Sequence, residues 1–139
     1  RDWPEPEARL KGAAVVLWSG IARYMRQHSQ DTLIGCASIG MSDGGANALA
    51  VYRALAARHL APIEYRVFPR HPLPLELLHA AAAPSIPPLL RGYLRVGAWI
   101  AGEPAWDPDF NTADLLVLLP LSRIEARYAR HYLGERQAA

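Results

Sequence analysis

A basic motif with small residues near the start of the chain has the composition of a phosphate-binding site. Arg9-Leu-Lys11-Gly12-Ala13-Ala14 has the form R-x-x-G-x-A and stands directly before a stretch with helical periodicity. Small residues let backbone N–H groups approach a phosphate at a helix N-terminus, where the helix dipole favours negative charge, and the two basic side chains add countercharge. We therefore predict a phosphate site here; the alternative is an ordinary basic helix start.

A second polar group precedes an apolar segment late in the chain. It consists of Asp107, Asp109, Asn111 and Asp114. Carboxylate and amide oxygens can bind an ammonium group or orient an amine, so the group is a candidate amine-binding site, which would be the acceptor site in a group-transfer enzyme. The alternative is that Asp and Asn cap turns and satisfy loop backbone groups.

Two further sets of residues complete the candidate sites. Arg91 and Arg95 stand one helical turn apart, where they could hold a carboxylate or an acidic protein; the alternative is a pair of solvated surface charges. Cys36 and Ser38 belong to an apolar segment with small residues, which leaves room beside it for a bound ligand or cofactor. No histidine is near Cys36 in the sequence, so we predict a small packing residue rather than a nucleophile.

Composition excludes several classes of protein. A net charge of +2 without a basic run gives no reason to expect nucleic acid binding. One cysteine excludes an internal disulfide, and five scattered histidines lack the paired spacing of a zinc site, so no metal is expected. No apolar run approaches the roughly 20 residues of a membrane span, and no signal peptide is recognisable. We expect a soluble cytoplasmic protein, with peripheral membrane contact left open.

The hydrophobic pattern predicts an α/β chain of 139 residues with one domain. Residues 1–8 are expected to be an irregular lead-in, and residues 69–88, with six prolines, an irregular excursion holding at most a short helix at 74–81. Helices are expected at residues 13–28, from the Ser42–Gly45 turn to residue 60, at 88–98 and after 122. Strands are expected at 31–39, 63–68 and 113–119.

Two stretches, Arg9–Ala14 and Tyr52–Leu55, resemble the acyl-donor half of the GNAT superfamily of N-acyltransferases. The chain resembles more closely the hemolysin-like, ornithine lipid synthase type, on five stretches in order: Leu17–Tyr24, Asp31–Ser38, His59–Pro62, Leu90–Arg95 and Trp106–Asp114. The resemblance implies a GNAT-like mixed sheet flanked by helices, and that the chain is the C-terminal part of such a domain without its N-terminal strands. Dimerisation or a complementing N-terminal segment would then complete the sheet.

The activity implied by the resemblance is transfer of a fatty acyl group, 3-hydroxylated or plain, from acyl carrier protein to the amine of ornithine or a similar amino acid. The donor would be acyl-phosphopantetheine or acyl-CoA, with no permanently bound cofactor, and Tyr52 would protonate the leaving thiolate. The alternative for Tyr52 is a core aromatic residue. The alternative functions are a non-catalytic binding or dimerisation module and an acetyl-CoA-dependent N-acetyltransferase.

Overall fold

The structure is a computed structural model that describes residues 6–127, with side chains described from Gly12 onward. The chain forms two compact units. The first contains the described residues up to Leu33 and from Pro120, and the second contains Ile34–Leu119. We describe each unit by itself.

The first unit is built on the long helix α1 (Pro6–Gln27). One face of α1 buries Trp18, Ala22 and Met25, and Ile124 of the helical residues 121–127 is also buried. An ion pair joins Arg26 to Glu125 at 2.8 Å. These contacts hold the helical residues 121–127 and α1 within one unit.

The start of α1 differs from the prediction. The helix begins at Pro6, so the expected irregular lead-in over residues 1–8 is wrong for residues 6–8, and residues 1–5 lie outside the described part. Proline is favoured in a first helical turn because its missing N–H has no partner there. Residues 9–14 are consequently helical rather than a loop before the helix.

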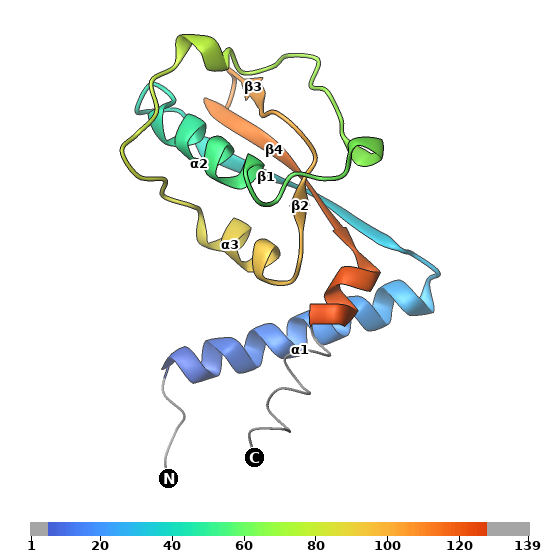
Figure 1. Ribbon diagram of the computed structural model, residues 1–139. Coiled ribbons are helices and arrows are strands. Elements are labelled where there is room, and N and C mark those ends of the chain that lie inside the picture. Colours follow the sequence, from blue (N-terminus) through green and yellow to red (C-terminus); the bar gives the residue numbers. More distant parts are fainter. Residues whose placement is uncertain (1–5, 128–139) are drawn as a thin grey trace. The chain divides into compact units, whose positions relative to one another are not determined.

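The second unit contains a four-stranded sheet with two helices (Figure 1). The strands are β1 (Thr32–Gly40), β2 (Trp99–Ile100), β3 (Ala105–Asp107) and β4 (Thr112–Pro120). Their order is β1-β4-β2, and β3 also pairs with β4. The outermost residues of β1 and β4 extend into the first unit. The long strand β4 therefore organises the sheet.

The predicted α/β class is confirmed, with the strand pairing resolved in more detail. Both β2 and β3 run antiparallel to β4, with Ile100 opposite Val117 and Ala105 opposite Asp114. A parallel contact occurs as the isolated bridge between Leu60 and Ile100. This arrangement of helices and antiparallel strands is consistent with a GNAT-like fold.

The two faces of the sheet differ in what they bury. Alternate residues of β1 and β4 are buried in the core: Ala37, Ile39, Ala113, Leu115, Val117 and Leu119. Helix α2 (Ala46–Ala56) buries Leu49, Val51 and Leu55, and helix α3 (Pro88–Arg95) buries Leu90 and Leu94. The intervening residues of β1 and β4 lie on the other face, where β1 is largely exposed. A strand places successive side chains on opposite faces, so this second face is where polar residues can meet.

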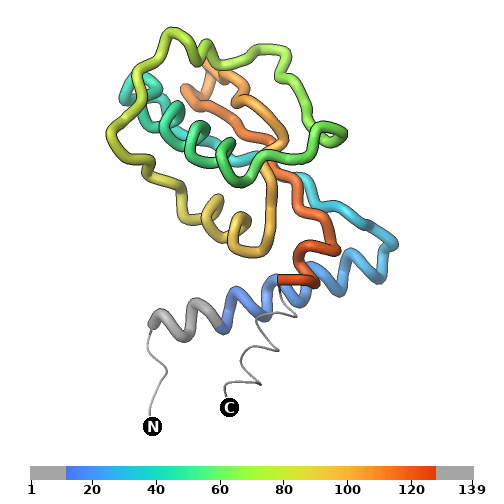
Figure 2. Tube along the Cα trace, in the orientation of Figure 1, coloured from blue at the N-terminus to red at the C-terminus, as the bar shows by residue number. Residues whose placement is uncertain are grey.

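The chain between α2 and α3 is irregular, and two sequence predictions within it are corrected. It leaves α2, passes beside β3 through the bridge between Pro72 and Ala105, and returns to α3 (Figure 2). The strand predicted at 63–68 is wrong, because Ile63–Tyr65 forms a 3-10 turn and Val67 donates its N–H to Ala101 without forming a ladder. The short helix expected within 74–81 is a 3-10 turn, Leu75–Leu77.

Candidate functional site

A cluster of three polar side chains lies on the second face of the sheet. Ser38 on β1 donates its hydroxyl to Asp114 Oδ1 on β4 at 2.7 Å. Thr112, two residues before Asp114 on the same face, donates its hydroxyl to the same oxygen at 2.9 Å. Asp114 Oδ2 takes part in neither bond, so it can accept a hydrogen bond from a ligand. We call Ser38, Thr112 and Asp114 the carboxylate cluster.

Cys36 lies beside this cluster, two residues before Ser38 on the same face of β1. Partial burial, and secondly the negative charge of Asp114, raise the pKa of the Cys36 thiol. The thiol is therefore neutral at physiological pH, and a neutral thiol is a poor nucleophile. The structure thus brings the predicted residues Cys36, Ser38 and Asp114 together, and it is consistent with Cys36 not being a nucleophile.

Of the three other residues in the predicted group, Asp107 and Asn111 stabilise the turn between β3 and β4, and Asp109 has an exposed side chain in that turn. Asp107 Oδ1 accepts hydrogen bonds from the N–H groups of Asp109 and Phe110, both at 3.1 Å. Asn111 has φ 52°, in the left-handed region that asparagine tolerates, and its carbonyl accepts the N–H of Met41. These contacts give Asp107 and Asn111 a structural role, which was the alternative raised for them; their predicted role in the acceptor site remains a prediction.

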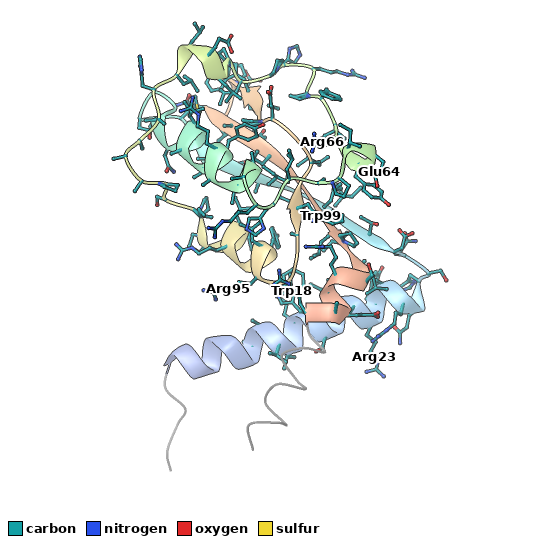
Figure 3. The ribbon with its side chains drawn as sticks, in the orientation of Figure 1. Trp18, Arg23, Glu64, Arg66, Arg95 and Trp99 are labelled. Atoms are coloured by element: carbon teal, nitrogen blue, oxygen red, sulfur yellow. The ribbon has the colours of Figure 1, made fainter. Side chains whose placement is uncertain are left out.

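Tyr52 has a separate neighbourhood. Its ring lies on α2 and is half-buried. Burial and the charge of Glu103 raise the pKa of the Tyr52 hydroxyl, against an opposing effect of Arg66. Arg66 belongs to the segment after α2 that also carries Glu64 (Figure 3), and its Nε donates to the Ala61 carbonyl at 3.0 Å. None of the residues that shift the pKa of Tyr52 belongs to the carboxylate cluster.

The two predicted arginines on α3 are both exposed. Arg91 donates a hydrogen bond to the Ile86 carbonyl at 3.1 Å, which fixes its guanidinium at the start of the helix. Arg95 lies in the last turn, where a cation complements the helix dipole. Their exposure leaves them accessible to an acidic partner.

The phosphate motif is not placed as predicted. Only N–H groups in the first turn of an α-helix lack an intrahelical partner. In α1 that turn covers residues 6–9, of which Pro6 has no N–H. Gly12, Ala13 and Ala14 lie further inside the helix, and the side chains of Arg9 and Lys11 lie outside the described residues. The predicted position of the motif at a helix N-terminus is therefore wrong, and its role in binding a phosphate stays a prediction.

The N-terminus of α2 is occupied by a carboxylate of the chain itself. Asp43 accepts hydrogen bonds from the N–H groups of Asn47 at 2.9 Å and Gly45 at 3.0 Å. These bonds, led by that of Asn47, lower the pKa of Asp43. Asn47 in turn exchanges two hydrogen bonds with the backbone of Ser85, at 2.8 and 3.0 Å. Asn47 thus anchors the irregular excursion to the start of α2.

An apolar groove of about 530 Å³ lies in the first unit, along α1 and the start of β1. Its lining includes Leu17, Tyr24 and Leu33, whose side chains are substantially exposed. Within residues 6–127 no group of histidine, cysteine and acidic residues could hold a metal ion. None of the helices in that range has both the length and the hydrophobicity needed to cross a membrane.

Sequence reasoning missed Thr112 as a site residue. Its signal was the period of two along β4, which places Thr112 on the same face as Asp114. Glu103 and Arg66, which act on Tyr52, carried no such signal because they come from loops.

Comparison with known proteins identifies relatives that share nearly the whole chain. The chain is 34% identical over 142 residues to the L-ornithine N(alpha)-acyltransferase of Brucella abortus (strain 2308), covering 97% of this chain and 50% of that protein. It is 38% identical over 138 residues to the protein of the same name from Agrobacterium fabrum (strain C58), covering 94% and 47%. No protein-family model matches the chain, and no solved structure shows a significant match.

The chain is homologous over almost all its length to the L-ornithine N(alpha)-acyltransferases, which confirms the predicted resemblance. It spans about half the length of the curated relatives it matches.

Proposed function

We propose that the chain is part of an N-acyltransferase that transfers a fatty acyl group, 3-hydroxylated or plain, from acyl carrier protein to the amine of ornithine. The observation that carries the proposal is a sequence similarity to proteins named L-ornithine N(alpha)-acyltransferase that extends over 94% or more of the chain. The donor is a substrate, acyl-phosphopantetheine on the carrier protein, and no cofactor stays bound.

The reaction is aminolysis of a thioester. The ornithine ammonium loses a proton to solvent, the nitrogen lone pair attacks the acyl carbonyl carbon, and a C–N bond forms. The attached nitrogen then loses a second proton to solvent, the oxyanion collapses, the C–S bond breaks, and the thiolate leaves with the sulfur electron pair to be protonated. Such a reaction needs one group that positions the amine and one that supplies a proton to the thiolate.

Asp114 is suited to positioning the amine. Two hydroxyls hold its Oδ1, so the direction of Oδ2 is fixed on the open face of the sheet. A carboxylate held in this way can accept a charge-assisted hydrogen bond from the ornithine ammonium. In this proposal Ser38 and Thr112 are positioning residues, and Asp114 is the group that contacts substrate.

Tyr52 is suited to the proton transfer. Its raised pKa keeps the hydroxyl protonated at physiological pH, so it can donate a proton to the leaving thiolate. Arg91 and Arg95 offer exposed positive charge for an acidic carrier protein.

The test is a chimaera in which this chain replaces the matched segment of the Agrobacterium fabrum protein. The chimaera is supplied with 3-hydroxyacyl carrier protein and ornithine, and the N-acylated amino acid is measured by mass spectrometry. We expect product with the long-chain donor, and little with acetyl-CoA.

The matched variants in this chimaera are Asp114→Asn and Asp109→Asn. Asp109 lies in the exposed turn after β3, so its change controls for the loss of one negative charge. Asp114→Asn should raise KM for ornithine at least tenfold, whereas Asp109→Asn should not. A folded chimaera without activity would indicate the non-catalytic module, and a preference for acetyl-CoA would indicate the N-acetyltransferase.

A further inference from the structure

The irregular segment after α2 exposes several apolar side chains to solvent. Phe68 is 87% exposed, Ile63 is 73% exposed and Val67 is 41% exposed. All three lie within residues 63–70, which we call the exposed segment. Single exposed apolar residues are ordinary, but several in succession indicate an interaction surface.

The exposed segment is fixed to the second unit rather than loosely attached. Val67 donates its N–H to the Ala101 carbonyl at 2.9 Å, and the Tyr65 ring is stacked on Trp99 with centroids 6.1 Å apart. A Cβ atom built on Gly102 would lie 2.4 Å from the Val67 carbonyl oxygen, so the two backbones are in close approach. The backbone is held in place while the side chains of Ile63 and Phe68 face outward.

The charged residues around Phe68 differ in sign from those around Phe110, the other exposed phenylalanine of the second unit. Phe68 stands between Arg66 and Arg70, both of which are exposed. Phe110, 80% exposed, follows Asp107 and Asp109 in the turn before β4. An apolar side chain flanked by arginines is complementary to an anionic lipid surface, whereas one flanked by carboxylates is repelled from it.

We infer that the exposed segment docks the protein on an anionic membrane, with Phe68 entering the interfacial layer and Arg70 binding lipid phosphates. Ile63 adjoins the exposed carboxylate of Glu64 and is not part of this contact. Arg66 adds positive charge while its Nε stays bonded to Ala61. The inference goes beyond the proposed function and is connected to it only through the lipid character of an N-acyl product. Membrane binding does not require acyl transfer, so the two proposals can fail separately.

The experiment measures cosedimentation of the full chain with vesicles. One set contains phosphatidylglycerol mixed with phosphatidylcholine, and the other contains phosphatidylcholine alone. We expect binding to the anionic vesicles that weakens as salt is raised, because surface charges are screened. Phe68→Ser should weaken binding about tenfold or more, from the lost burial of the ring. Arg70→Gln should weaken it about fivefold.

Phe110→Ser is the matched control, because it removes an equally exposed ring from acidic surroundings. It should bind the anionic vesicles like the unmodified chain. Circular dichroism of each variant verifies that it is folded. Equal binding to both kinds of vesicle, or equal losses in Phe68→Ser and Phe110→Ser, would overturn the inference. Phe68-dependent binding to purified acyl carrier protein without vesicle binding would also overturn it, in favour of a protein partner.

Discussion

Ser38 Oγ on β1 lies 2.7 Å from Asp114 Oδ1 on β4, across 76 residues of sequence. The pairing of the two long strands creates this contact, and Thr112 adds a second donor to the same oxygen. A carboxylate that accepts two hydroxyls has a defined orientation even on an exposed surface. The same geometry therefore bears on both the stability of the sheet and the proposed binding of the amine.

Ser38→Ala should destabilise the fold modestly, by about 0.5–1 kcal/mol, because the lost bond is to a charged but exposed group. Thermal unfolding measures the change, with Ser42→Ala in the exposed turn before α2 as the control. In a double-mutant cycle, Ser38→Ala should cost less when Asp114 is already Ala. Additive effects would show that the two side chains do not interact in solution.

The meeting of these residues could not be predicted from sequence, although each residue was. Composition and spacing singled out Ser38, Cys36 and Asp114 separately. Their contact depends on which strands pair and in which register, and a shift of one residue would turn Asp114 into the core. The buried residues of β4 and the helices α2 and α3 were predictable because their apolar periodicity is local.

The errors of the sequence analysis have physical reasons of the same kind. The alternation at residues 63–68 is typical of a strand, but the segment lies between Pro62 and Pro69, and its apolar side chains face outward. The short strands β2 and β3 were missed because they exist only through pairing with β4. The local sequence pattern carries no information on which distant strand a strand of two or three residues will pair with.

Alkylation of Cys36 should depend on the charge of Asp114. The negative charge disfavours the thiolate, so Asp114→Asn should lower the pKa of Cys36 towards its ordinary value and speed the reaction with iodoacetamide at mildly alkaline pH. The rate against pH measures the shift, with Asp109→Asn as the charge-matched control. Burial still raises the pKa in the variant, so the shift should be partial. Identical pH profiles in both variants would contradict the proximity of Asp114 to Cys36.

Tyr52→Phe should reduce kcat of the chimaera about 10²-fold or more if the hydroxyl protonates the leaving thiolate. The raised pKa keeps the hydroxyl protonated, so the activity of the parent should not decline until the pH exceeds the ordinary tyrosine value of about 10. Steady-state kinetics against pH measures both effects. Tyr65→Phe, which keeps the ring stacked on Trp99, is the control and should retain activity. A Tyr52→Phe variant with full kcat would remove Tyr52 from the mechanism and leave it a packing residue.

The two glycines before α2 should respond differently to alanine. Both Gly44, with φ 78°, and Gly45, with φ 90°, have left-handed backbones, so each substitution should cost about 1–2 kcal/mol of unfolding free energy from strain alone. A Cβ atom on Gly44 meets nothing within 4 Å, whereas one on Gly45 lies 2.7 Å from the Met41 Cε and 3.1 Å from Leu78. Gly45→Ala should therefore be the more destabilising change, because Met41 and Leu78 must move. Chemical denaturation of both variants measures the difference, and equal losses would show that Leu78, and with it the irregular excursion, does not pack on this turn in solution.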